Sequence, residues 1–201
     1  MMKKLSVFLI LAILFLSFVS CSSARETEDG GLIANIEGTN IHYRRYENYM
    51  AVSVKIGTTI AKTQSAEYYM VSGLDVKEYL CTHPDMGSVI YCKESMTLPQ
   101  LDGFNPNEVY VCLFSSDSTV AYPLEHEAVL HKIVEQMINN DVIAMPTVVH
   151  QSFILNFVSE DYPYLYYSLR FVVDRQGNGY LIDRQNNRCI RLTDDVTQAL
   201  L

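Results

Sequence analysis

The chain contains no tryptophan, no internal repeat, no low-complexity tract and no Cys-x-x-Cys pair. The missing Cys-x-x-Cys pair argues against redox catalysis and against a structural zinc site. Basic residues are also scarce, because 15 lysines and arginines face 23 aspartates and glutamates, for a formal charge of −8. No nucleic acid is expected as a partner, since binding to phosphates needs a basic surface. The 14 tyrosines suggest aromatic rings at half-exposed positions, where the hydroxyl reaches water or a partner.

The first twenty residues have the pattern of an export signal. Lys3 and Lys4 precede an apolar run from Leu5 to Val19 that is interrupted by two serines. This run is shorter than the ~20 apolar residues that a membrane-spanning helix needs. A charged start, an apolar core and small residues before a cleavage point are typical of a secretory signal peptide. Residues 1–20 are therefore predicted to be removed.

The segment Phe18-Val19-Ser20-Cys21 resembles the end of a bacterial lipoprotein signal peptide, although Phe18 stands where that family prefers leucine. In that family the cysteine after the cut takes diacylglycerol on its sulfur. The resemblance implies lipid attachment at Cys21 and a membrane-anchored protein in the bacterial cell envelope that faces away from the cytoplasm. Without residues 1–20 the chain keeps 13 basic and 23 acidic residues, a formal charge of about −10.

The rest of the sequence is predicted to form a tether and one domain. Residues 21–31 show no apolar periodicity and end in two glycines, so we expect a flexible, lipidated tether. Residues 32–201 are long enough to bury a core, and no second linker divides them. They are predicted to be a single domain.

Most of this domain has the pattern of β-strands. Between Met50 and Ile56 apolar residues occupy every second position, which is typical of a strand with one buried face. Other β-rich runs are separated by turn residues, and three short runs near the C-terminus predict a tight meander. The β-rich runs are 67–71, 76–81, 88–92, 109–114, 152–158 and 164–173, and the meander consists of 169–173, 180–182 and 189–192.

Helices are predicted at two places. Apolar residues from Leu130 to Ile138 recur at i, i+3, i+4, i+7 and i+8, so they lie on one face of a long amphipathic helix with Pro123 in its first turn. A short C-terminal helix is expected to begin after Thr193. The predicted fold class is α+β, a mostly antiparallel sheet with one long helix packed on it.

The cysteines other than Cys21 allow either of two states. An even number of cysteines in an exported protein permits two disulfides, with three possible connectivities. The alternative is a set of buried thiols that act as small apolar residues in strands. If the hairpin turns near Pro84, Cys81 faces about Ser88, so pairing with Cys92 is not required. The possible disulfide residues are Cys81, Cys92, Cys112 and Cys189.

Two segments resemble metal sites in part. His126 and His131 are five residues apart, which rotates them by about 140° around a helix, so they cannot easily share a zinc ion. Asp174, Gln176 and Asn178 match the first ligand positions of a calcium loop. That loop lacks the final glutamate, and a hairpin turn at Asn178 explains the same residues. No metal and no cofactor are therefore predicted.

Two groups of tyrosine and arginine form a possible recognition surface, because both residue types are favoured where proteins bind partners. The alternative is that the tyrosines pack half-buried in strands. The groups are Tyr43, Arg44, Arg45 and Tyr46, and Tyr162, Tyr164 and Tyr166.

We expect a non-catalytic envelope module that binds a protein or a glycan, since the sequence contains no catalytic motif such as a Gly-x-Ser-x-Gly elbow. The alternative is a small envelope hydrolase or transferase whose active site forms only in the fold. It predicts a deep pocket with a titratable residue, such as His150 or His83, beside an acid.

Overall fold

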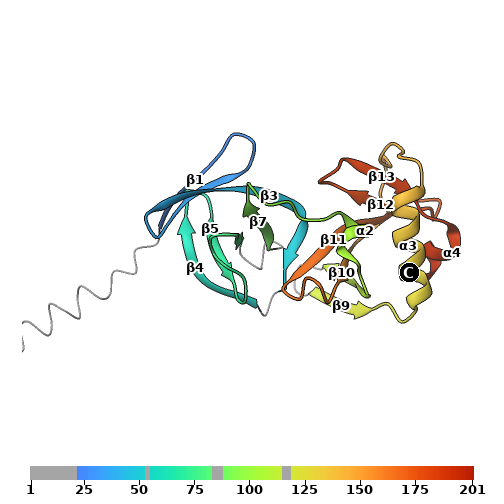
Figure 1. Ribbon diagram of the computed structural model, residues 1–201. Helices are drawn as coiled ribbons and strands as arrows, with labels where there is room; N and C mark the ends of the chain where they lie inside the picture. The colour runs from blue at the N-terminus through green and yellow to red at the C-terminus, as the bar shows by residue number, and fades with distance from the viewer. Residues whose placement is uncertain (1–21, 53–54, 83–87, 115–118) are drawn as a thin grey trace, which may run out of the picture.

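The computed structural model describes residues 22–52, 55–82, 88–114 and 119–201 (Figure 1). These residues form thirteen strands and three short helices. The expected α+β class is therefore wrong, and the fold is mostly β. None of the described helices is long and apolar enough to cross a membrane.

The first seven strands form a closed barrel. Around the ring they follow the order β2-β1-β4-β5-β6-β7-β3, and pairing of β2 with β3 closes it. Neighbouring strands are antiparallel except β1 and β4, which are parallel. The strands are β1 (Ser22–Glu26), β2 (Leu32–Ile36), β3 (Thr39–Ala51), β4 (Ile56–Lys62), β5 (Glu67–Val71), β6 (Tyr79–Cys81) and β7 (Val89–Lys93).

The remaining strands form a second part of the same sheet, which we call the C-terminal sheet. It begins at the end of β3, where Leu165 pairs with Ala51, and continues in the order β11-β10-β8-β9. Two further strands, β12 and β13, extend from β11 as an antiparallel meander, which confirms the predicted one. The strands are β8 (Glu108–Phe114), β9 (Thr119–Pro123), β10 (Gln151–Val158), β11 (Leu165–Val173), β12 (Gly179–Asp183) and β13 (Arg188–Arg191).

The helices are shorter than the sequence pattern suggested. They are α2 (Leu101–Phe104), α3 (Glu127–Asn139) and α4 (Asp194–Ala199), and α3 and α4 lie at the end of the molecule away from β1 (Figure 1). The expected long amphipathic helix is wrong because Pro123 ends strand β9, where it pairs with Tyr110. The apolar face of α3 is correspondingly narrow, since Ile138 is 48% exposed.

The expected tether is replaced in part by a strand. Residues Ser22–Glu26 form β1, which pairs with β2 on one side and β4 on the other. Without β1 both neighbouring strands would expose unpaired edges, so ring closure explains why this polar segment is ordered. The turn that follows spans Thr27 to Gly31, and the amide of Thr27 donates to the carbonyl of Gly31.

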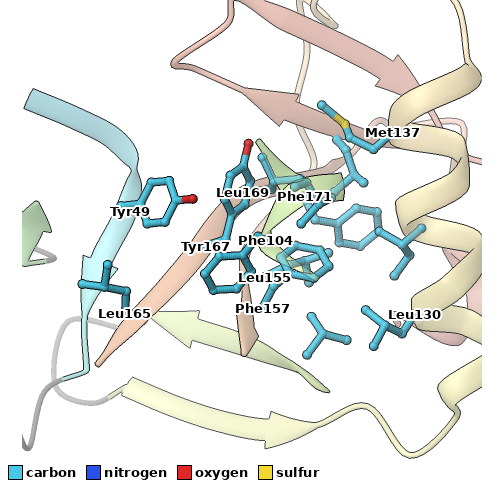
Figure 2. Close-up of a cluster of buried hydrophobic side chains, with 14 of the residues drawn as sticks. Tyr49, Phe104, Leu130, Met137, Leu155, Phe157, Leu165, Tyr167, Leu169 and Phe171 are labelled. Carbon is cyan, nitrogen blue, oxygen red and sulfur yellow. The ribbon is translucent and has the colours of Figure 1, made fainter. Parts of the chain in front are cut away.

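Two large apolar cores and a small cluster of Val172, Ile182 and Cys189 are buried among the described residues. The barrel interior is filled by apolar residues such as Leu32, Ala34 and Leu80. A larger core lies between the C-terminal sheet and the helices, where the rings of Phe104 and Tyr167 pack against Tyr49 of the barrel strand β3 (Figure 2). Since β3 contributes to both cores, it fixes the barrel to the C-terminal sheet.

Candidate functional site: the barrel mouth

An open hollow of about 600 Å³ lies at one end of the barrel. We call it the barrel mouth and define it by Glu26, Arg45, Tyr68 and Tyr91, which line it. The barrel interior around Leu80 is filled with apolar side chains, so the mouth is a shallow site and not the entrance of a channel.

Strand alternation explains which side chains reach the mouth. On β3, Ile41, Tyr43 and Arg45 fall on the same face, and the first two are buried in the barrel. Arg45 is the next inward position and pairs in register with Tyr91 of β7. The basic side chain therefore stands where the apolar interior ends.

Glu26, the last residue of β1, is held by a set of hydroxyl groups. Its Oε1 atom accepts hydrogen bonds from Ser65 at 2.7 Å, Tyr68 at 3.1 Å and Thr63 at 3.2 Å. The Ser65 bond is the main cause that lowers the pKa of Glu26, and the other two hydroxyls and the positive charge of Arg45 act in the same direction. The carboxylate is therefore ionised at neutral pH and fixed in position.

The floor of the mouth is aromatic. The rings of Tyr68 and Tyr91 lie edge to face with centroids 5.2 Å apart, and both side chains are buried. Burial raises the pKa of both hydroxyls, so both remain protonated and can donate hydrogen bonds.

A second hollow of about 310 Å³ adjoins the mouth. It shares Arg45 with the mouth and is also lined by Asp29, Arg44 and His42. Arg45 thus lies between two hollows. Together they are large enough for a ligand that is bigger than a single small molecule.

The first predicted group of tyrosines and arginines is divided between the two faces of β3. Tyr43 lies inside the barrel and donates to the carbonyl of Val76 at 2.7 Å. Tyr46 is buried in the larger core. Arg44 and Arg45 are exposed, and of the four residues only Arg45 lines the mouth.

Two residues of the second predicted group, Tyr162 and Tyr164, pack against the larger core, which also contains Tyr46. Tyr162 stacks on Phe104 with ring centroids 5.1 Å apart, and Tyr164 packs closely over Gly73. Tyr166 pairs with Met50 of β3 and is half-buried. The structure does not bring the two groups together on one surface.

The candidate calcium loop is a turn whose carboxylate is already occupied by protein groups. Asp174 accepts the amides of Gln176 and Asn178 on one oxygen, and the Asn178 side chain and the Tyr180 hydroxyl on the other. Gln176 contributes through its backbone amide in this turn. Within the described residues, no three histidine, cysteine or acidic side chains are grouped to hold a metal ion.

The four cysteines beyond Cys21 are buried free thiols, so the possible disulfides are not formed. Cys81 pairs in register with Ile90, and not with Ser88 as expected from a turn near Pro84. Burial raises the pKa of Cys81 to about 12 and of Cys92 to about 11. These thiols are therefore poor nucleophiles. The full set is Cys81, Cys92, Cys112 and Cys189.

Of the two histidines named for the enzymatic alternative, His150 and His83, only His150 lies within the described residues. His150 is exposed beside the start of β10, and His131 is exposed on α3 with its ring 3.6 Å from Glu127. His83 and the predicted lipid-attachment residue Cys21 lie outside the described residues.

Sequence reasoning missed three of the four residues at the mouth. Glu26 fell within the expected tether, and Tyr68 and Tyr91 were strand tyrosines with no mark of function. No signal in the sequence marks β1 as a strand, because Ala24 is the only apolar residue of this segment.

The chain matches no protein-family model, no curated protein and no solved structure.

Proposed function

We propose that this protein is a lipid-anchored component of the bacterial cell envelope that binds a short glycan at its barrel mouth without catalysing a reaction. The observation that carries the proposal is the combination at one hollow of the ionised carboxylate of Glu26, the guanidinium of Arg45 and two tyrosine rings. The anchor rests on the lipoprotein-like segment that ends at Cys21.

The chemistry of the mouth suits a sugar ring. Sugar hydroxyls donate to a carboxylate and accept from a guanidinium, and the buried rings of Tyr68 and Tyr91 form an apolar floor beneath these two groups. Glu26 and Arg45 have opposite charges, so the pair favours a neutral sugar over a strongly charged ligand. The adjoining hollow beyond Arg45 favours a chain of more than one unit.

The state of Glu26 favours binding over catalysis. A glycosidase needs one carboxyl group with a raised pKa to protonate the leaving oxygen. Hydrogen bonds lower the pKa of Glu26, so it is a poor proton donor at neutral pH. The same carboxylate is a strong acceptor for hydroxyl groups.

The binding test uses the full chain in mild detergent, probed with immobilised N-acetylglucosamine oligomers and maltotriose. We expect one of these probes to bind the wild type and Arg45→Gln to weaken it about tenfold, the effect of losing a hydrogen bond to a charged group. Arg25 is the matched control, because it is exposed on β1 next to Glu26 and does not line the mouth.

The proposal fails if neither probe binds, or if Arg25→Gln weakens binding as much as Arg45→Gln. The anchor is tested separately by the intact mass of protein extracted from membranes. Added acyl mass in the wild type that is missing in Cys21→Ala supports lipid attachment.

A further inference from the structure

The connection between α3 and β10 presents apolar side chains to solvent. Residues 141–150 form neither helix nor strand, and nine of these ten residues are exposed. We call this segment the apolar loop. Its large apolar side chains are between 38% and 55% exposed, and a run of such side chains marks a surface that contacts a partner or a membrane. They are Val142, Ile143, Met145, Val148 and Val149.

The apolar loop is bonded to the C-terminal meander, which consists of the end of β11, β12 and β13. Near the start of the loop, the amide of Ile143 donates to the carbonyl of Cys189 in β13 at 2.8 Å. At its end, the amide of His150 donates to the carbonyl of Val173 in β11 at 2.7 Å. These two bonds fix the loop, so its apolar side chains lie beside the meander.

The meander carries an excess of positive charge in an otherwise acidic chain. Residues 170–191 include five arginines and two aspartates, whereas the chain after residue 20 has a formal charge of about −10. Both aspartates are buried and accept hydrogen bonds from protein groups. Arg175 and Arg184 are exposed in the two turns of the meander, and Arg191 forms an ion pair with Asp194 at 3.8 Å. The arginines are Arg170, Arg175, Arg184, Arg188 and Arg191.

An apolar loop beside arginines is complementary to a membrane that contains anionic lipids. The arginines attract the headgroups, while the apolar side chains enter the boundary between headgroups and acyl chains. At that depth the backbone of an irregular loop still reaches water. A second copy docked symmetrically on this surface would bring like-charged arginines together. A soluble polyanion would contact the arginines but leave the apolar side chains in water.

We infer that the apolar loop enters the headgroup region of an anionic lipid membrane, with the arginines of the meander against the headgroups. No residue of the loop lines the barrel mouth, so this surface is separate from the proposed glycan site. The inference does not depend on lipid attachment at Cys21. In an anchored protein the loop is a second membrane contact, and without an anchor it gives reversible binding.

The test uses a single tryptophan as a fluorescent probe, since the chain contains none. Met145→Trp places the probe in the apolar loop. Val120→Trp is the matched control, because Val120 is 53% exposed on β9, at the edge of the C-terminal sheet opposite β13. Each full-length variant is mixed with vesicles of phosphatidylcholine, with or without phosphatidylglycerol, whose acyl chains carry bromine as the quencher. With phosphatidylglycerol, we expect about a twofold loss of fluorescence in Met145→Trp and little loss in the control.

The role of charge is tested by adding Arg175→Gln and Arg184→Gln to the Met145→Trp protein. We expect most of the quenching to disappear, as it should at high salt without these changes, whereas Arg25→Gln on the barrel strand β1 should leave it intact. Equal quenching of the two probes, quenching that needs neither phosphatidylglycerol nor the arginines, or no quenching at all overturns the inference. A blue shift of the Met145→Trp emission that grows with protein concentration in the absence of vesicles also overturns it, in favour of a contact between copies.

Discussion

The side-chain amide of Asn48 donates a hydrogen bond of 2.6 Å to Asp183, which lies 135 residues later in the chain. Both side chains are 3% exposed. Asn48 belongs to the barrel strand β3, and Asp183 ends β12 of the C-terminal sheet. The hydroxyl of Tyr167 lies 3.2 Å from the Asn48 amide, so three strands meet in one buried polar cluster.

This cluster should stabilise the joint between the barrel and the C-terminal sheet. Asn48→Ala removes a donor from a buried carboxylate, and we expect it to lower the free energy of unfolding by about 2 kcal/mol. Asn40→Ala is the matched control, since its exposed bond to Asn35 should contribute little. Urea denaturation checks both, and equal losses in the two variants would contradict a special role for Asn48.

Gly73 and Gly38 have similar backbone angles but different surroundings. Their φ values are +97° and +83°, both in the region that disfavours other residues. A methyl group on Gly73 would overlap the Tyr164 ring, whereas nothing lies within 4 Å of the same position on Gly38. We expect Gly38→Ala to cost about 1 kcal/mol from backbone strain.

Gly73→Ala should cost about 3 kcal/mol, because the overlap with Tyr164 adds to the same strain. Thermal unfolding of the two variants measures the difference. The cost of Gly73→Ala should be smaller in a Tyr164→Ala background than in the wild type. If Gly73→Ala lowers stability equally in both backgrounds, the ring contact is not the cause.

Individual strands and the C-terminal meander could be predicted from the sequence, whereas the closed barrel could not. The run from Glu67 to Val71 is β5 as predicted, because the strand preference of its tyrosine and valine residues is a local property of the sequence. Closure of the barrel depends on β1 pairing with β2 and with the distant β4, and no local pattern records such pairings. The polar segment of β1 therefore had the appearance of a tether.

The candidate site was missed for the same reason. Arg45 was singled out by its type, but its position at the mouth follows from the inward face of β3. Glu26 gains its role from Ser65, Thr63 and Tyr68, which lie at least 37 residues away. Side chains that meet only through barrel closure cannot be grouped from their spacing in the chain.

Asp174 makes stability depend on pH in the acidic range. The Asn178 side-chain bond is the main cause that lowers its pKa to about 2, below the usual value of about 3.9 in an unfolded chain. Its contribution is therefore complete above about pH 4 and is lost as the pH falls toward 2. Asp174→Asn should flatten this part of the stability curve.

The measurement is urea unfolding at about pH 5 and about pH 2.5 for the wild type and the variant. Asp194→Asn serves as the comparison, because that side chain is 89% exposed. An unchanged pH dependence in Asp174→Asn would show that other carboxylates control this range.

The buried cysteines give a direct test of the thiol state. All four described cysteines are free and buried, and burial raises the pKa of each. We expect no reaction with iodoacetamide in the native protein at neutral pH, because thiolates are scarce and shielded. After unfolding without a reductant, mass spectrometry should find four alkylated thiols besides Cys21. A species that is alkylated only after reduction would show a disulfide.

Two threonines near the C-terminus should respond to the same substitution in opposite directions. The hydroxyl of Thr197 is buried without a hydrogen-bond partner among the described residues, so Thr197→Val should raise the free energy of unfolding by about 1 kcal/mol. Thr193 instead accepts a 2.9 Å bond from Gln136 of α3, and Thr193→Val should lower it by about 1 kcal/mol. Denaturant midpoints compare the two. A loss of stability in Thr197→Val would show that its hydroxyl has a partner, such as an ordered water, because valine preserves the shape and removes only the polar group.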